Sequence, residues 1–366
     1  MPRRVLFVSK PIAPPFHDGT KCLVRDVARA LTAVQPIVMT TRGAPAIAGV
    51  EQARVYVAPG RFAPSAAANL RAATWLLARS RADLWHFVFA PNPRTSRAGR
   101  VIAGLRRMPV VQTVASPPRS FDAIDRLLFG DVVVAQSGWT RDRIRERAPA
   151  RRVELIPPPL AVPEPRTPEA IAAARRALDI APGVPILIYP GDLETSSGAR
   201  AVKDLVAPLA RQHGDAVVVF AYRAKTPRAE LLAAELAREL DPRRVRIKGD
   251  VADVLALIQA SSAVLFPVDD LWGKVDLPIV LLEAMALGVP VVAYDFGPLA
   301  ELKGVLHVPT GDQRALFRAT NATLADAGLR ERVIAEQRET VLSCHDQKRV
   351  AGAYERLYLE LLDHAP

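Results

Sequence analysis

The sequence is poor in cysteine, in aromatic residues and in long apolar runs. Cys22 and Cys344 are its two cysteines and lie in different halves, so we expect reduced thiols and no disulfide framework. No apolar run approaches the roughly 20 residues that a membrane-spanning helix needs. The opening MPRRVLFVSK leads directly into a predicted strand, which argues against a secretory signal. These absences predict a cytoplasmic protein, whose contact with a membrane would be peripheral and on the inner face.

The length and the order of predicted elements indicate two domains. A chain of 366 residues exceeds one ordinary core and suits two domains of about 150 to 200 residues. Strands, loops and helices alternate in both halves, which favours two Rossmann-like, doubly wound parallel sheets of the α/β class. The proline-rich stretch 157–168 reads as a linker. We therefore predict an N-terminal domain over 1–160, a C-terminal domain over 161–345 and a final amphipathic helix over 346–366.

Positive charge is concentrated in the first half. Residues 1–160 hold 25 Lys/Arg against 10 Asp/Glu, a net of +15, while the remainder holds 24 against 28, a net of −4. This asymmetry predicts an anionic partner: a phosphorylated acceptor, a lipid headgroup surface or, least favoured, nucleic acid. The basic stretch 141–147 is one candidate surface. A general richness in arginine is the competing explanation, and no nucleic-acid-binding motif is present.

The most informative stretch is 263–301. It predicts a buried strand at 263–266, a polar loop, a helix that begins near Pro278 and stops at Gly288, and a second buried strand at 289–294. A helix that follows the carboxyl end of a parallel strand presents its free N–H groups to an anion such as a diphosphate. Glu283 in this helix can accept hydrogen bonds from a ribose; a solvated surface carboxylate is the alternative.

The motifs LLEAMA at 281–286 and GVPVVA at 288–293 resemble the C-terminal signature of family 4 glycosyltransferases. These are retaining enzymes with the GT-B fold. The resemblance implies two Rossmann-like domains facing a cleft, with the last helix crossing back to the first domain. It also implies transfer of a sugar, with retention of configuration, from a nucleotide sugar, UDP or GDP being the favoured nucleotides. The acceptor would bear a hydroxyl and be anionic, lipid-linked or a small molecule, and no cofactor would be required.

Four positions depart from the family pattern: Val275 replaces the first glutamate of the signature, Ala115 a histidine, Asp192 an arginine and Ser197 a lysine. A diphosphate bound without metal needs neutralising charge, so the last two losses bear on the donor site. Three interpretations follow. The chain is a divergent enzyme with its own donor-binding residues, or a GT-B protein that has lost catalysis and serves as a binding or regulatory partner, or an enzyme with a different GT-B chemistry, such as a phosphorylase or epimerase.

Candidate donor-site residues lie in the second half. We predict catalytic roles for Glu283, Lys274 and Asp276, and phosphate binding by Arg223, Lys225 and Lys274, for which solvated loop cations are the alternative. Asp269, Asp270 and Asp276 are candidates for sugar hydroxyls, but no further carboxylate or histidine stands at ligand spacing, so no metal is predicted. The remaining residues expected at the donor are Gly191, Asp192, Gly249, Val251, Leu277, Gly297 and Leu299.

Candidate acceptor-site residues lie in the first half. The loop after the first strand carries His17, Asp18, Gly19 and Thr20, where a glycine lets backbone approach a ligand. His86 lies in the strand 83–89 and has a buried core histidine as its alternative reading. Three further predictions follow strands: Asn92, Arg94 and Ser137. Thr140 is expected to cap the helix after Ser137.

Overall fold

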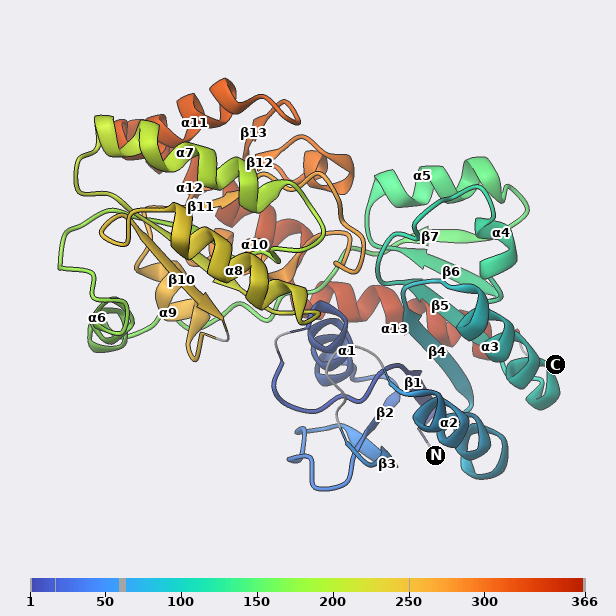
Figure 1. Ribbon diagram of the computed structural model, residues 1–366. Coiled ribbons are helices and arrows are strands. Elements are labelled where there is room, and N and C mark those ends of the chain that lie inside the picture. Colours follow the sequence, from blue (N-terminus) through green and yellow to red (C-terminus); the bar gives the residue numbers. More distant parts are fainter. Residues whose placement is uncertain (1, 17, 59–63, 250, 365–366) are drawn as a thin grey trace. The chain divides into compact units, whose positions relative to one another are not determined.

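The computed structural model describes residues 2–16, 18–58, 64–249 and 251–364, and its elements are labelled in Figure 1. The chain forms two compact units. Unit 1 comprises Met1–Ala161, Trp272–Ile279 and Cys344–Pro366, and unit 2 comprises Val162–Leu271 and Val280–Ser343. The predicted second domain ran without a break over 161–345, whereas Trp272–Ile279 belongs to unit 1.

Unit 1 contains a seven-stranded parallel sheet in the order β3-β2-β1-β4-β5-β6-β7. Its strands are β1 (Arg4–Val8), β2 (Gln35–Thr41), β3 (Glu51–Tyr56), β4 (Leu84–Phe89), β5 (Val110–Val114), β6 (Val132–Ala135) and β7 (Val153–Leu155). Its helices are α1 (Gly19–Ala30), α2 (Ala66–Arg79), α3 (Pro93–Arg106), α4 (Ile124–Leu127), α5 (Gly138–Arg147) and α13 (Gln347–Asp363). The central strands are continuous apolar runs because helices cover both faces of the sheet.

Unit 2 contains a six-stranded parallel sheet in the order β10-β9-β8-β11-β12-β13. Its strands are β8 (Ile186–Tyr189), β9 (Val217–Tyr222), β10 (Val245–Gly249), β11 (Ala263–Phe266), β12 (Val291–Tyr294) and β13 (Leu306–Val308). Its helices are α6 (Pro168–Arg176), α7 (Gly198–Gln212), α8 (Arg228–Glu239), α9 (Val254–Gln259), α10 (Ile279–Ala286), η1 (Gly297–Glu301), α11 (Gln313–Ala325) and α12 (Ala327–Cys344). Two parallel-sheet α/β units confirm the predicted fold class.

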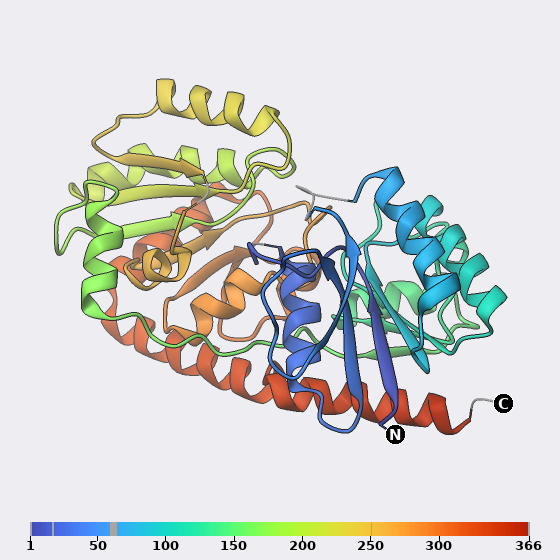
Figure 2. The same cartoon turned by 90° about the horizontal axis from the view of Figure 1, so that it is seen from below.

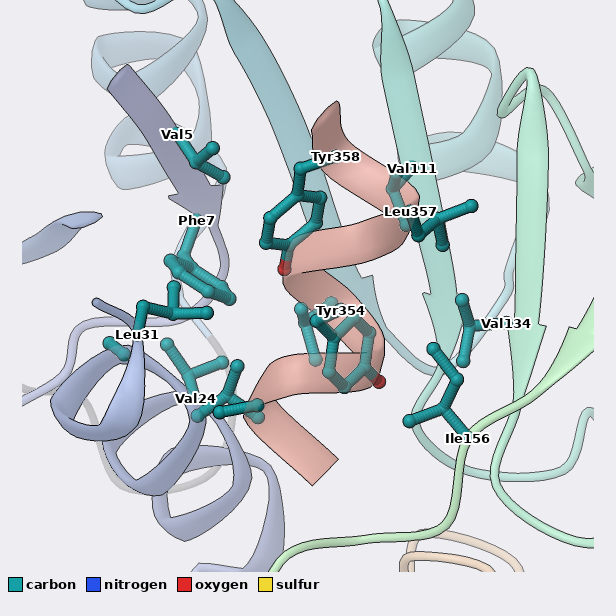
Figure 3. Packing of buried hydrophobic residues seen from close by; sticks show 14 of the residues in the cluster. Val5, Phe7, Val24, Leu31, Val111, Val134, Ile156, Tyr354, Leu357 and Tyr358 are labelled. Atoms are coloured by element: carbon teal, nitrogen blue, oxygen red, sulfur yellow. The ribbon is translucent and has the colours of Figure 1, made fainter. Parts of the chain in front are cut away.

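Each face of the unit 1 sheet has its own layer of helices. One face packs against α1 and α13, whose side chains Val24, Tyr354 and Leu357 join the strand residues Val5 and Phe7 in one core (Figure 3). The other face packs against α2 and α3 in one cluster and against α4 and α5 in a second. The final helix is therefore part of the core of unit 1, because its tyrosines and leucines are buried there.

His86 of β4 joins α13 to the sheet. Its Nε2 lies 2.7 Å from Thr113 Oγ1 and its Nδ1 lies 2.7 Å from the Tyr358 hydroxyl, while Thr113 also contacts the Tyr354 hydroxyl at 3.2 Å. The ring is buried. Burial lowers the pKa of His86 to about 3, since desolvation penalises the charged ring. Of the two sequence-based readings of His86, these contacts favour the core histidine, which has no exposed edge to offer an acceptor.

We predict that His86 makes unit 1 sensitive to acid. The unfolded chain takes up a proton near pH 6.5 and the folded chain only near pH 3, so stability falls as the pH drops through that interval. The free energy of unfolding, measured with urea from pH 4 to 7.5, should decrease toward acid more steeply in the wild type than in His86→Gln. The difference in slope approaches about 1.4 kcal/mol per pH unit. His364→Gln, at an exposed position, should keep the wild-type slope.

The structure corrects one predicted helix cap. Ser137, not Thr140, is the N-cap of α5: its Oγ accepts a hydrogen bond from the Thr140 backbone N–H at 3.1 Å. Ser137 has the extended backbone that an N-cap requires, while Thr140 lies inside the helix and is buried. Thr140 stands three residues after Ser137, which is the N3 position of a helix that Ser137 caps.

Candidate functional site

In unit 2, the loop after β8 is shaped by the tyrosine beneath it. The Tyr189 hydroxyl donates to the Asp192 carbonyl at 2.8 Å, and a Cβ on Gly191 would lie 2.3 Å from the tyrosine ring. A Cβ on Gly198 would lie 2.9 Å from the same hydroxyl. Both positions therefore require glycine because the loop closes tightly over Tyr189. Gly191 was predicted as a donor contact, and the structure provides a packing reason for it.

Asp192 forms a buried ion pair with Lys225, which follows β9. The Lys225 Nζ lies 3.0 Å from Asp192 Oδ2, and the two side chains are 8% and 3% exposed. The other carboxylate oxygen of Asp192 accepts hydrogen bonds from the backbone N–H groups of Glu194 at 3.2 Å and Thr195 at 2.9 Å, and from the Thr195 hydroxyl. One of the predicted phosphate-binding cations, Lys225, is thus balanced by the Asp192 carboxylate, at a position where the resemblance implies an arginine.

Two further carboxylates tie neighbouring loops of unit 2 together. Glu194 accepts from the backbone N–H groups of Lys225 at 3.0 Å and Thr226 at 2.8 Å. Asp269, after β11, accepts from the Ser197 N–H at 2.8 Å and from its hydroxyl at 2.5 Å. The loops that follow β8, β9 and β11 therefore form one hydrogen-bonded cluster at the carboxyl edge of the sheet. This is the edge where open parallel sheets bind ligands.

Helix α10 begins at Ile279 and is almost entirely apolar. Leu281, Leu282, Ala284 and Met285 are buried, whereas Glu283 is half-buried. Glu283 is the one charged residue of this helix. A carboxylate in so apolar a segment is well suited to a polar ligand, and the first backbone N–H groups of an α-helix have no partner within the helix itself.

The segment Trp272–Ile279 makes specific contacts within unit 1. The Ser137 hydroxyl donates to Asp276 Oδ2 at 2.8 Å, and both side chains are buried. Val275 packs on Gly19, where a Cβ would lie 2.8 Å from the valine methyl groups. The Arg119 guanidinium lies 4.3 Å from the centre of the Trp272 ring. The predicted candidates Gly19, Ser137 and Asp276 are therefore brought together around this segment.

We predict that Ser137→Ala destabilises unit 1 by about 2 to 4 kcal/mol, because it removes a helix cap and a hydrogen bond to a buried carboxylate. Ser65→Ala is the matched control: Ser65 caps α2 through the Ala68 N–H at 3.2 Å and is exposed. It should cost about 1 kcal/mol. Urea unfolding of both variants gives the comparison, and equal losses would show that the Asp276 contact contributes nothing.

Other predicted acceptor residues serve as helix caps. Asp18 caps α1 by accepting from the Thr20 and Lys21 N–H groups, and it pairs with Lys10 at 2.9 Å. Asn92 caps α3 by accepting from the Thr95 N–H at 3.0 Å. Arg94 is exposed at the start of that helix, and His17 lies outside the described residues. Helix capping is thus a sufficient structural reason for the polar side chains of Asp18 and Asn92. A role for these residues in ligand binding stays a prediction.

The remaining donor candidates vary in exposure. Leu277 and Leu299 are buried, Gly249 is exposed, and the half-buried candidates are Val251, Gly297, Arg223, Asp269, Asp270 and Lys274. Gly297 has a φ of +55°, which a glycine adopts without strain. In the part of the chain that the structure describes, no cluster of three or more His, Cys, Asp or Glu side chains is arranged to hold a metal ion.

Sequence reasoning missed the pairing of Asp192 with Lys225 and the role of Glu194. A signal was available: the apolar runs at 186–189 and 217–222 are consecutive in the chain, and consecutive strands of a doubly wound sheet often pair, so the residues that follow them would share one edge of the sheet. Opposite charges at Asp192 and Lys225 then predict an ion pair.

No helix among the described residues is both long and apolar enough to span a membrane.

The family 4 resemblance is confirmed. Residues 184–326, which include β8 to α11, match the family described as glycosyl transferases group 1. The phosphatidyl-myo-inositol mannosyltransferase of Mycobacterium leprae is 36% identical over 121 residues, a match that spans 31% of this chain and 31% of that protein. Both matches concern part of the chain.

Comparison of structures extends over nearly the whole chain and shows the GT-B fold. The Anabaena protein Alr3699/HepE, solved in complex with UDP and glucose, has a TM-score of 0.75 at 15% identity, with 98% of this chain and 100% of that chain covered. The sucrose-phosphate synthase of Thermosynechococcus elongatus has a TM-score of 0.73 at 19% identity, with 99% of each chain covered. At sequence identities of 15% and 19%, the structural similarity is evidence for the fold alone.

Proposed function

We propose that the protein is a glycosyltransferase that moves a sugar from a nucleotide-sugar donor to a hydroxyl-bearing acceptor, with retention of anomeric configuration. The observation that carries this proposal is the family match over 184–326, a region that contains Glu283 on α10. Relatives of the same fold support the donor class, since Alr3699/HepE was solved with UDP-glucose. UDP and GDP are the favoured nucleotides, and no metal or other cofactor is required.

The donor would bind at the carboxyl edge of the unit 2 sheet. The backbone N–H groups at the start of α10 are placed to meet the diphosphate, and Glu283 the ribose hydroxyls. Lys225 and Arg223 would supply positive charge, with Lys225 exchanging part of its contact with Asp192 for a phosphate oxygen. The loops held by Glu194 and Asp269 would provide a rigid frame for the bound nucleotide, which favours precise positioning.

The chemistry needs no nucleophile from the protein. An oxygen of the donor phosphate takes the proton of the acceptor hydroxyl on the same face from which the nucleotide leaves, so the configuration at the sugar carbon is retained. The protein contributes orientation of the two substrates and stabilisation of the leaving diphosphate. The acceptor would be anionic, lipid-linked or a small molecule, and a peripheral membrane contact through unit 1 belongs to the same proposal.

A second candidate function is binding without catalysis, and the Asp192–Lys225 pair favours it. The pair neutralises a cation that the diphosphate needs. Incubation with UDP- and GDP-sugars, with water or simple alcohols as acceptors, separates the two functions. A product whose anomeric proton, followed by NMR, has the configuration of the donor supports transfer. Nucleotide binding with no product from any donor supports the binding protein.

A further inference from the structure

Helices α2 and α3 form one layer on the unit 1 sheet. They lie side by side in both views (Figures 1 and 2). Ala72 and Leu76 of α2 and Ile102 and Ala103 of α3 are buried in a single cluster with the strands beneath them. The opposite sides of both helices therefore face away from the sheet.

The outward sides of these helices carry exposed apolar residues. Leu70 of α2 is 67% exposed, and Val101 and Leu105 of α3 are 54% and 69% exposed. Val101 and Leu105 follow Arg97 at intervals of four residues, so all three lie in one row along the helix. Isolated exposed leucines are common on soluble proteins. The outward sides of two adjacent helices thus carry three large exposed apolar side chains, and exposed apolar residues that gather in one region are typical of an interaction site.

The same region is rich in arginine and almost free of acid. Between Glu51 and Asp122 the chain has eleven arginines and one acidic residue, Asp83. Arg100 and Arg106 donate to backbone carbonyls that join α3 to its neighbours. In the described part of the chain, none of the following has a carboxylate partner: Arg71, Arg79, Arg94, Arg97 and Arg107. Their charge is therefore available to an external anion.

Helix α5, the basic stretch that the sequence suggested as a surface, differs in this respect. Arg141 pairs with Asp142 at 2.8 Å, Arg147 lies 3.7 Å from Glu146, and Arg143 stacks on Trp139. Local acids thus offset two of the four arginines of α5, and Arg145 donates to the Val153 carbonyl at 2.9 Å. The candidate surface is therefore on α2 and α3 and not on α5. The arginines named above for α2 and α3 have no carboxylate partner in the described part of the chain, and exposed apolar side chains lie on the same helices.

We infer that the outward face of α2 and α3 binds the surface of an anionic lipid bilayer. Arginines flanking exposed leucine and valine match such a surface, because the guanidinium groups meet lipid phosphates while the apolar side chains enter the acyl boundary. Phosphates of nucleic acid would use the arginines and leave Leu70, Val101 and Leu105 in water. The inference deepens the membrane contact of the proposed function and does not depend on sugar transfer.

The test measures binding of the full chain to vesicles by sedimentation at low ionic strength. Vesicles of phosphatidylcholine are compared with vesicles of equal parts phosphatidylcholine and phosphatidylglycerol. Val101→Glu/Leu105→Glu should lower the partition coefficient for the anionic vesicles by about ten-fold or more. Arg71→Gln/Arg97→Gln, which removes one exposed arginine from the outward side of each helix, should lower it by about ten-fold. Leu231→Glu is the matched control, since Leu231 is 66% exposed on α8, beside Glu230.

Selective binding to anionic vesicles, lost in the two double variants and kept in Leu231→Glu, supports the inference. Three results would overturn it: no binding of the wild type to anionic vesicles, equal binding to both vesicle types, or an apolar double variant that binds like the wild type. In the last case, displacement by duplex DNA would indicate general electrostatic attraction. Titration of the same proteins with nucleotides separates the membrane proposal from the proposed function. Nucleotide affinity reports on unit 2, so the substitutions in α2 and α3 of unit 1 should leave it unchanged.

Discussion

Lys225→Met should lower the free energy of unfolding by about 3 to 5 kcal/mol, because it leaves the Asp192 carboxylate buried without its counter-charge. Asp192 is 3% exposed, so water cannot take the place of the ammonium group. The hydrogen bonds from Glu194 and Thr195 remain and place the loss toward the lower end of that range. Urea unfolding of unit 2, followed in the full chain, provides the measurement.

Two comparisons make this prediction specific. Lys203 pairs with Glu239 at 2.8 Å, but the two side chains are 31% and 56% exposed, so Lys203→Met should cost at most about 1 kcal/mol. The double variant Asp192→Asn/Lys225→Met removes both charges and should recover most of the loss. A Lys225→Met variant no less stable than Lys203→Met would show that the buried pair is energetically unimportant.

The second large effect concerns the proposed donor. Glu283→Ala should weaken the affinity for the preferred nucleoside diphosphate by about 10- to 100-fold, because hydrogen bonds to a charged acceptor contribute about 1.5 to 3 kcal/mol. The half-buried position of Glu283 limits competition from water. Isothermal titration of wild type and variant provides the measurement.

The matched control for Glu283 is Glu331→Ala, at an exposed position of α12. It should leave nucleotide affinity unchanged. If Glu283→Ala binds the nucleotide as tightly as Glu331→Ala, Glu283 has no role at the ribose and is a surface carboxylate of an otherwise apolar helix. Thermal unfolding of both variants shows whether a loss of affinity reflects a loss of fold.

Local pattern was sufficient to predict most of the fold. The apolar runs of β1, β8 and β11 and the glycine after α10 define strands and helix ends through interactions between near neighbours in sequence. The motif at 281–286 identified the fold family because it combines a buried helix with the strand that follows it. The sequence pattern predicts a helix from about Cys22, whereas α1 begins three residues earlier at Gly19, because Asp18 caps it.

What escaped prediction depends on contacts between distant residues. The place of Trp272–Ile279 in unit 1 is supported by the hydrogen bond between Ser137 and Asp276, which are 139 positions apart. His86 is held by Thr113 and by Tyr358 of the last helix, which no local pattern reveals. The ligand roles of Glu283, Lys274 and Asp276 rest on chemistry that a bound nucleotide would test.

The most direct test of the proposed donor site is a calorimetric titration of the wild type with UDP, GDP, ADP, CMP and dTDP. The proposed function predicts that one nucleoside diphosphate binds at a single site with a dissociation constant below the millimolar range, and that Glu283→Ala weakens this binding. If none of the five binds at millimolar concentration, the nucleotide-sugar donor is contradicted, and the chain is better understood as a GT-B protein without a donor site.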